Sequence, residues 1–358
     1  MMKTEITAFD LAFLTRELQA LVGEWLDKTY ILGDRGFLIT FGNKTMLQAT
    51  PSSCWIPVTK PETPEKIHPF AARLRKLIGN SKVLTIEQVC SERILAVRVR
   101  RSEKEYVLYL EIFGRGNIIL CDATNIVLAA LAMNNRVQRD QAYKLPESID
   151  TFHMDEREFA LKFAQSTDNA SKTLAVQFGL GKTLAEELCV RSGVSASETA
   201  TPQHAQEMHL ALKKLLSQES KPQLIHDNSI LLDVTPIPFD CYANKKRENV
   251  QSFGQALARI FAVPAAAVKE QKLVPMQKKL QKIETMIALQ QKNLAVLEQK
   301  AVQEHKTGEY LYEHYQEVKQ LLADIVEAKK TLSWKEVKAK FKQIQELNEA
   351  TGDVTVDI

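Results

Sequence analysis

The chain has 358 residues, of which 45% are hydrophobic and 25% are charged, the proportions of an ordinary soluble protein with two or three domains. Lys and Arg outnumber Asp and Glu by 47 to 44, so the net charge is only +3 and any binding of nucleic acid must come from local basic clusters. No apolar run reaches the roughly 20 residues of a membrane span, and the start lacks the apolar core of a signal peptide. These features predict a cytoplasmic protein that does not enter a membrane.

Five cysteines are scattered along the chain without any Cys-x-x-Cys pair: Cys54, Cys90, Cys121, Cys189 and Cys241. An odd number without paired spacing argues against a disulfide framework and a zinc site, and fits a reducing compartment. The seven histidines show no metal-binding spacing either. We therefore expect no metal and no cofactor.

The first 150 residues predict a helix followed by a sheet. Apolar residues at helical spacing predict an amphipathic helix over 8–22, and Thr7 and Asp10 have the spacing of a capping box at its start. The next predicted elements are strands at 29–32 and 37–41 and a short helix from Pro69 to Gly79.

From residue 83 to 132 the pattern becomes a series of strands, at 93–100, 106–113, 117–122 and 126–131. Connections of a few residues leave no room for crossover helices, so we expect an antiparallel meander. A helix followed by a sheet, without repeated βαβ units, predicts the α+β class.

The most informative run is Phe178–Leu188. Gly179 and Gly181 permit a tight turn directly ahead of a helix N-terminus, where free amides and the helix dipole favour an anion. Lys182 and Thr183 add a charge and a hydroxyl at the same place. This is the pattern of a helix-hairpin-helix that binds a nucleic-acid phosphate independently of sequence. A glycine cap between two ordinary packed helices explains the pattern equally well.

The rest of the chain is predicted to contain helices over 151–216, a strand at 229–234 and a helix over 252–261. Apolar residues from Leu273 to Ala301 follow the 3-4 spacing of a coiled-coil seam of about four heptads. We expect Gly308 to interrupt it, with a second helix carrying Leu311 to Ile325. The tail, 352–358, alternates like a strand without a visible partner, which we interpret as the sign of a truncation.

We accordingly divide the chain into five segments: an α+β domain (1–150), a helix-hairpin-helix domain (151–225), a strand and helix connector (226–265), a coiled-coil and middle region (266–347) and a truncated strand-like tail (348–358).

No catalytic arrangement stands out. The sequence has no Gly-x-Ser-x-Gly, no Walker loop and no Rossmann glycine fingerprint. The glycine-rich run at 114–116 is followed by a strand and not a helix, which favours a β-turn over a phosphate cradle. Asp10 as a helix cap, and Glu92-Arg93 as a surface pair, need no function. We expect a protein that is not an enzyme.

Several short motifs nevertheless form a recognisable series. They are ITAFDL at 6–11, DRG at 34–36, EIFGRGNIILCD at 111–122, YKLP at 143–146, GEYLY at 308–312 and SW at 333–334. In this order they resemble the motifs of the NFACT family, the RqcH/NEMF type of ribosome-associated quality-control factor formerly called fibronectin-binding protein A. The resemblance covers nearly the whole chain.

The resemblance implies a factor that binds obstructed large ribosomal subunits carrying peptidyl-tRNA and recruits tRNA, chiefly alanyl-tRNA. The stalled chain then gains a C-terminal alanine tail without mRNA, and the subunit itself transfers the peptide. Residues important to tailing are an early Asp, matched by Asp10, and an Asp-Arg pair, matched by Glu92 and Arg93, where Glu92 is longer by one methylene. The expected tRNA- or RNA-binding residues are Asp10, Glu92, Arg93, Gly179, Gly181, Lys182 and Thr183.

Family members continue into an NFACT-R domain, so the resemblance also implies a fragment, a shortened protein, or a split protein whose partner chain supplies that domain. The N-terminal domain resembles the fold of formamidopyrimidine-DNA glycosylases, whose Schiff-base chemistry needs an N-terminal Pro-Glu. Here Met2 and Lys3 follow the initiator. A helix-hairpin-helix scaffold for DNA binding or repair, without glycosylase activity, is the alternative function. A surface adhesin is a third, against which the lack of an export signal weighs.

Overall fold

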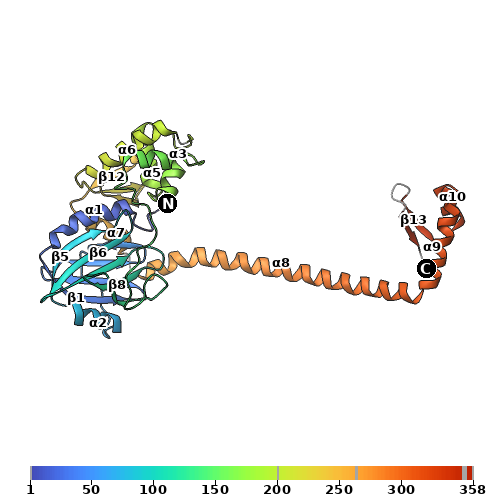
Figure 1. Ribbon diagram of the computed structural model, residues 1–358, viewed down its shortest axis with the longest axis horizontal. Helices are drawn as coiled ribbons and strands as arrows, with labels where there is room; N and C mark the ends of the chain where they lie inside the picture. The colour runs from blue at the N-terminus through green and yellow to red at the C-terminus, as the bar shows by residue number, and fades with distance from the viewer. Residues whose placement is uncertain (1, 200, 263–264, 349–352, 357–358) are drawn as a thin grey trace. The chain divides into compact units, whose positions relative to one another are not determined.

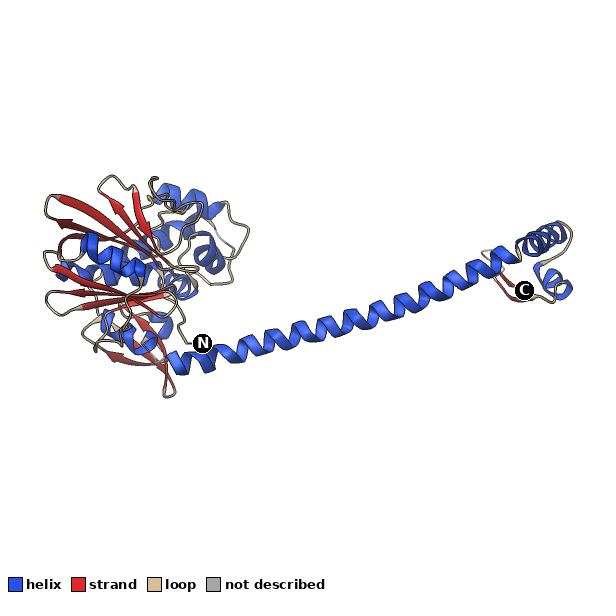
Figure 2. Cartoon of the chain, turned by 90° about the horizontal axis from the view of Figure 1, so that it is seen from below, coloured by secondary structure: helices blue, strands red, loops and turns tan. Residues whose placement is uncertain are grey.

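The computed structural model describes residues 2–199, 201–262, 265–348 and 353–356. The chain forms two compact units, Met1–Pro264 and Ala265–Ile358. The first unit holds a large sheet and most of the helices (Figures 1 and 2).

The large sheet has nine strands in the order β4-β3-β2-β1-β5-β6-β7-β8-β9, and every neighbouring pair is antiparallel. The antiparallel arrangement and the α+β class are confirmed. The strands are β1 (Trp25–Leu32), β2 (Gly36–Phe41), β3 (Met46–Thr50), β4 (Ser53–Trp55), β5 (Ser81–Gln88), β6 (Ile94–Arg101), β7 (Lys104–Glu111), β8 (Asn117–Asp122) and β9 (Val127–Ala130). The predicted β-turn at 114–116 joins β7 to β8, with Gly114 and Gly116 at positive φ.

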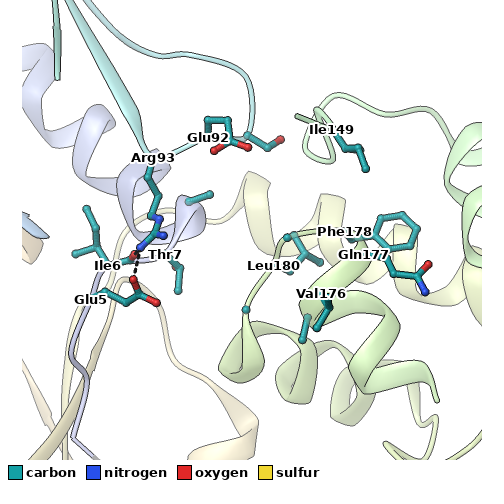
Figure 3. A pocket seen from close by; sticks show the side chains of 15 residues that line it. Glu5, Ile6, Thr7, Glu92, Arg93, Ile149, Val176, Gln177, Phe178 and Leu180 are labelled. Carbon is teal, nitrogen blue, oxygen red and sulfur yellow. Dashed lines mark hydrogen bonds and ion pairs between the residues drawn. The ribbon is translucent and has the colours of Figure 1, made fainter. Parts of the chain in front are cut away.

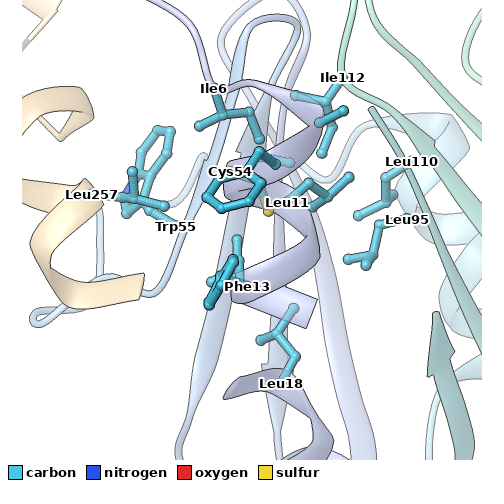
Figure 4. Close-up of a cluster of buried hydrophobic side chains, with 14 of the residues drawn as sticks. Ile6, Leu11, Phe13, Leu18, Cys54, Trp55, Leu95, Leu110, Ile112 and Leu257 are labelled. Atoms are coloured by element: carbon cyan, nitrogen blue, oxygen red, sulfur yellow. The ribbon is translucent and has the colours of Figure 1, made fainter. Parts of the chain in front are cut away.

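Helix α1 (Ala8–Leu18) is the centre of the core, and a short 3-10 helix, η1 (Gln19–Leu21), follows it. In Figure 4, Leu11 of α1 lies between Trp55 of β4 on one side and Leu95 of β6 on the other, and all three are buried. Helix α2 (Pro69–Ile78) begins with proline and ends at a glycine cap, as its sequence predicts.

The helical part of the first unit follows the sheet along the chain. It contains α3 (Glu156–Ala164), α4 (Ala170–Lys172), a π-helical turn η2 (Thr173–Gln177), α5 (Lys182–Ser192) and α6 (Pro202–Ser217). In Figure 1, α3, α5 and α6 lie together at one end of this unit, with α2 at the other.

A second, three-stranded sheet in the order β11-β10-β12 completes the first unit. Its elements are β10 (Gln223–Asp227), β11 (Ile230–Thr235), a 3-10 turn η3 (Asp240–Tyr242), β12 (Lys246–Asn249) and the following helix α7 (Phe253–Phe261). The sequence predicts β11 and α7 but misses β10 and β12. One hydrophobic core runs from Ile6 to Ile260, so the predicted boundaries at 150 and 225 divide a single core, and the second falls within β10.

The second unit begins with the long helix α8 (Ala265–Glu313), which passes straight through Gly308. The predicted interruption at Gly308 is wrong, because one interior glycine costs a helix only about 1 kcal/mol and the helix continues for several turns before it. The break comes at His314, before α9 (Tyr315–Lys329). The described part of the predicted seam is open, with Ile283 and Leu297 more than half exposed, so coiled-coil pairing stays a prediction.

The end of the second unit contains α10 (Trp334–Lys340) and a hairpin of β13 (Ile344–Leu347) and β14 (Val354–Val356). The tail strand therefore has an antiparallel partner, contrary to the expectation of an unpaired strand. Of that predicted tail, 349–352, 357 and 358 lie outside the described residues.

Candidate functional site

The glycine hairpin before α5 has the backbone geometry that its sequence predicts. Gly179 and Gly181 have φ of 66° and 76°, in the region that favours glycine. Gly181 is the N-cap of α5, and within the described part of the chain no side chain makes a capping hydrogen bond to this helix N-terminus. Leu180 between the glycines is buried, so it fixes the hairpin to the core while the amide end of α5 stays open to an anion.

A pocket of about 350 Å³ lies beside this hairpin. Its walls come from three segments: residues 5–8 at the start of α1, residues 91–93 before β6, and residues 175–181. Ile149 completes the lining. Figure 3 shows Glu92 and Arg93 on the sheet side of this space, with Val176 and Leu180 on the helical side. The pocket therefore joins the two parts of the first unit that the sequence singles out.

The charged groups of the pocket are two carboxylates and one guanidinium. Arg93 Nη1 lies 2.5 Å from Glu5 Oε2 and donates to the carbonyl of Ile6 at 3.2 Å. The Glu92 side chain makes no hydrogen bond or ion pair with the residues that the structure describes. The pocket therefore offers one open carboxylate acceptor beside one guanidinium donor, together with apolar walls.

Four of the seven predicted site residues line this pocket: Glu92, Arg93, Gly179 and Gly181. Lys182 stands next to it, with its side chain 84% exposed and 3.6 Å from Glu186. The side chain of Thr183 instead lies near the Tyr242 hydroxyl. Lys182 is thus free to reach a ligand, whereas Thr183 is occupied within the fold.

Asp10, the seventh predicted residue, does not face the pocket. Its side chain is 4% exposed, and Asp10 Oδ2 accepts hydrogen bonds from the Thr7 amide at 2.8 Å and the Thr7 hydroxyl at 2.9 Å. Thr7 Oγ1 accepts in turn from the Asp10 amide, which completes the predicted capping box. The predicted capping box is thus confirmed, and the role of Asp10 in RNA binding stays a prediction.

Lys3 is the residue that sequence reasoning missed. Its ammonium lies 2.9 Å from Asp10 and 3.0 Å from Asp233 on β11, and donates to the carbonyl of Val234 at 2.8 Å. Burial by itself lowers the pKa of Lys3, but the two carboxylates outweigh it and hold the pKa above its ordinary value. The amine is therefore a buried cation, which is the wrong state for a Schiff-base nucleophile.

The Lys3 cluster extends to α5. Asp233 Oδ2 accepts from the Tyr242 hydroxyl at 2.7 Å, and Tyr242 in turn contacts Thr183 at the start of α5. Burial and the Asp233 carboxylate both raise the pKa of Tyr242, so its hydroxyl keeps the proton that it donates. No local signal could reveal a cluster whose members lie more than 200 residues apart in sequence.

The motif at 111–122 has a structural role in this fold. Glu111 Oε1 accepts from Arg136 at 2.9 Å and from the Tyr143 hydroxyl at 2.8 Å, which ties the YKLP segment to the sheet. Arg35 of the DRG turn donates to the carbonyl of Gly116 at 3.1 Å. Two of the motifs that carry the family resemblance are thus in direct contact.

Among the described residues, no helix is long and apolar enough to cross a membrane. The same part of the chain contains no group of three or more His, Cys, Asp or Glu side chains placed to hold a metal ion.

Two solved structures have the fold of the first unit. The fibrinogen-binding protein of Staphylococcus aureus matches 72% of this chain and 99% of its own chain with a TM-score of 0.60 at 16% identity. The N-terminal part of the fibronectin/fibrinogen-binding protein of Streptococcus suis matches the same shares with a TM-score of 0.56 at 20% identity. At these identities the likeness shows the fold alone.

Curated relatives extend the comparison to the whole chain. The archaeal Rqc2 homolog aRqcH of Methanocaldococcus jannaschii is 25% identical over a gapped alignment of 394 positions that covers 99% of this chain and 58% of that protein. Ribosome quality control complex subunit 2 of Saccharomyces cerevisiae is 31% identical over 135 residues, 36% of this chain and 13% of that protein. The human ribosome quality control complex subunit NEMF is 27% identical over 158 residues, which covers 42% of this chain and 15% of that protein. The chain therefore spans little more than half of its archaeal relative.

The family model of the NFACT N-terminal and middle domains matches residues 7–357, which is almost the entire sequence. The chain belongs to the NFACT family.

Proposed function

We propose that this protein is a ribosome quality-control factor that binds tRNA on obstructed large ribosomal subunits and promotes C-terminal alanine tailing of the stalled chain. One observation carries the proposal: the pocket brings Glu92 and Arg93 together with the Gly179–Gly181 hairpin. In this proposal the chain binds and positions tRNA, the ribosomal subunit transfers the peptide, and the chain itself is not an enzyme.

The chemistry of the pocket suits a nucleotide. A carboxylate such as Glu92 accepts hydrogen bonds from base amino groups and from the 2′-hydroxyl, and a guanidinium such as Arg93 donates to carbonyls and phosphates. Lys182 and the amides at the start of α5 add a site for a phosphate at the rim. The names of the archaeal and eukaryotic relatives support the ribosome quality-control part of the proposal.

The test is sedimentation of the full chain with split large subunits that carry peptidyl-tRNA, followed by measurement of the retained protein and tRNA. We expect co-sedimentation, and clear loss of it in the Arg93→Glu and Lys182→Glu variants. Lys214→Glu on the exposed side of α6 is the charge-matched control. Free migration of the wild-type protein, with no tRNA retained, would refute the proposal.

A helix-hairpin-helix scaffold for DNA is the competing function, because the amide end of α5 would serve a DNA phosphate equally well. Competition between tRNA and duplex DNA at stated salt concentrations separates the two. We expect tRNA to displace duplex DNA, and the reverse order would favour the DNA scaffold.

A further inference from the structure

One corner of the large sheet, away from the pocket, carries an exposed tryptophan among basic side chains. Trp25 at the start of β1 is 55% exposed, whereas Trp55 is buried. Strand pairing places Trp25 opposite Lys82 of β5, and Lys82 opposite Arg100 of β6. Because directly opposed residues point to the same face of a sheet, the three side chains form one row across it.

This row lies on the outer face of the sheet. The residues that alternate with it, Leu26, Ser81 and Val99, are fully buried against the core. The helical part of the unit does not cover the row, since Lys82 and Arg100 are exposed along with Trp25. The aromatic ring and both cations are therefore open to a partner.

The charge around the row is strongly positive for this protein. The basic corner contains Trp25 and six cations: Lys82, Arg98 and Arg100 on the face of the row, and Lys76, Arg101 and Lys104 around the adjoining edge of the sheet. Three carboxylates lie among them, Glu24, Glu103 and Glu105, so the corner has the same net charge of +3 as the whole chain.

Only some of these cations form ion pairs within the protein. Glu105 pairs with Arg100 at 2.6 Å and lies 3.9 Å from Arg98. Lys76, Lys82 and Lys104 have no ion pair with any residue that the structure describes. Lys76 and Lys104 also line a shallow cavity of about 360 Å³ at the edge of the corner.

We propose that the basic corner is a second RNA-binding surface, on which a base stacks on Trp25 and the neighbouring phosphates contact Lys82, Arg98 and Arg100. A stacking aromatic ring flanked by exposed cations is the arrangement with which proteins hold single-stranded nucleic acid. An acidic protein segment would pair with the cations, but its carboxylate side chains offer no planar base to stack on the ring of Trp25. The pocket, by contrast, contains two carboxylates for one guanidinium and cannot supply this positive field.

The corner and the pocket lie at opposite ends of β6. Seven residues of extended chain separate Arg93 from Arg100, which is about 23 Å. No single nucleotide reaches both places, but a folded RNA does. The inference rests on the proposed function and adds that the bound tRNA makes a second, sequence-tolerant contact.

The test measures binding of the full chain to two labelled probes, a tRNA transcript and a short oligouridylate, by fluorescence anisotropy at several salt concentrations. We expect Lys82→Glu/Arg100→Glu to weaken binding of both probes at least tenfold and to reduce the salt slope by about 1.5, since two phosphate contacts are lost. Trp25→Ala should weaken oligouridylate binding roughly tenfold, and Trp25→Phe should restore most of it.

The control is Lys66→Glu/Lys214→Glu, which changes the net charge equally at two exposed positions outside the corner. Circular dichroism melting shows whether each variant keeps its fold. If the corner variants bind both RNAs like the wild type, or lose no more affinity than the control, the inference is wrong. If the wild type binds oligouridylate through the corner but does not bind tRNA, the proposed function fails and the corner stands. If it binds neither RNA, both fail.

Discussion

The first unit contains two clusters of charged side chains that both include residues from the N-terminal segment, Lys3 in one and Glu5 in the other, and they differ in burial. In the Lys3 cluster, the side chains of Lys3, Asp10 and Asp233 are 11%, 4% and 7% exposed, and each charge has a partner. In the pocket, Arg93 is 25% exposed and its partner Glu5 is 58% exposed. The first cluster is closed to ligands, and the second is open.

This difference separates structural from ligand-binding residues more sharply than the motifs do. Buried charges interact strongly, but removing one partner leaves the other charge buried and uncompensated, which destabilises the fold. Exposed pairs contribute little to stability and are easily exchanged for a ligand. We therefore assign Asp10 to the support of the site, and Glu92 and Arg93 to ligand contact.

The largest effect is expected at the closed cluster. Lys3→Met leaves the carboxylates of Asp10 and Asp233 buried without a cation, and should lower the free energy of unfolding by about 3–5 kcal/mol. Urea unfolding, followed by circular dichroism, measures the change.

The triple variant Lys3→Met/Asp10→Asn/Asp233→Asn is the control for this experiment, because it removes the uncompensated charges as well as the ammonium. It should recover a large part of the lost stability. A loss below about 1 kcal/mol in Lys3→Met would mean that the cluster behaves like an exposed pair and that the contrast with the pocket is wrong.

A loss of stability of intermediate size is expected at the Gly179–Gly181 hairpin. Gly181 has φ 76° and ψ 164°, a conformation essentially confined to glycine, so Gly181→Ala should cost about 1–3 kcal/mol. The nearest atom to the new methyl group, Thr7 Cγ2, would lie 3.6 Å away, so the cost comes from the backbone and not from a clash.

The matched control is Gly193→Ala at the other end of α5, where φ is 70°. We expect a similar loss of stability from Gly193→Ala, but loss of tRNA affinity only from Gly181→Ala. Equal tRNA affinities in the two variants would show that the hairpin has no role beyond packing.

At the Arg93–Glu5 ion pair of the pocket we expect a small effect on stability and a large effect on tRNA binding. Arg93→Met should change the free energy of unfolding by less than about 1 kcal/mol, because Glu5, its partner in the ion pair, is more than half exposed. The same variant should lose at least tenfold in tRNA affinity, since a charge-assisted contact contributes about 1.5–3 kcal/mol. Glu5→Gln releases the guanidinium and should strengthen binding, and weaker binding in Glu5→Gln would contradict this assignment.

The sequence predicts what depends on neighbouring residues. Thr7 and Asp10 are three residues apart, and their capping box is found as expected. The alternation of the strands and the short turns between them determine the antiparallel sheet. The resemblance to NFACT proteins, and not composition, directs attention to Glu92 and Arg93, which do line the pocket.

What the sequence does not predict depends on distant residues. Lys3 and Asp233 are in direct contact although almost the whole sequence of the first unit separates them, and no rule of sequence spacing predicts this pair. Strand β12, Lys246–Asn249, has no apolar residue and is recognisable only by its pairing with β10. Helix α8 continues through Gly308 because the cooperativity of a long helix outweighs the low helix propensity of one glycine.

The smallest effect is expected beside the pocket, at Asp150. Ser91, which lines the pocket, donates to Asp150 Oδ1 at 2.7 Å, and His153 Nδ1 lies 2.9 Å from the same oxygen. Burial by itself raises the pKa of Asp150, but the hydrogen bonds from His153 and Ser91 outweigh it and hold the pKa below its ordinary value.

The stability that Asp150 contributes is therefore present above its unfolded pKa of about 3.9 and is lost as the pH falls through the lower folded value. We expect the free energy of unfolding of Asp150→Asn to fall less steeply than that of the wild type between pH 4 and pH 2. Parallel curves would show that this carboxylate does not order the 91–93 turn. A steeper wild-type curve would show that the Asp150 carboxylate, through its hydrogen bond with Ser91, helps to hold the 91–93 wall of the pocket in place.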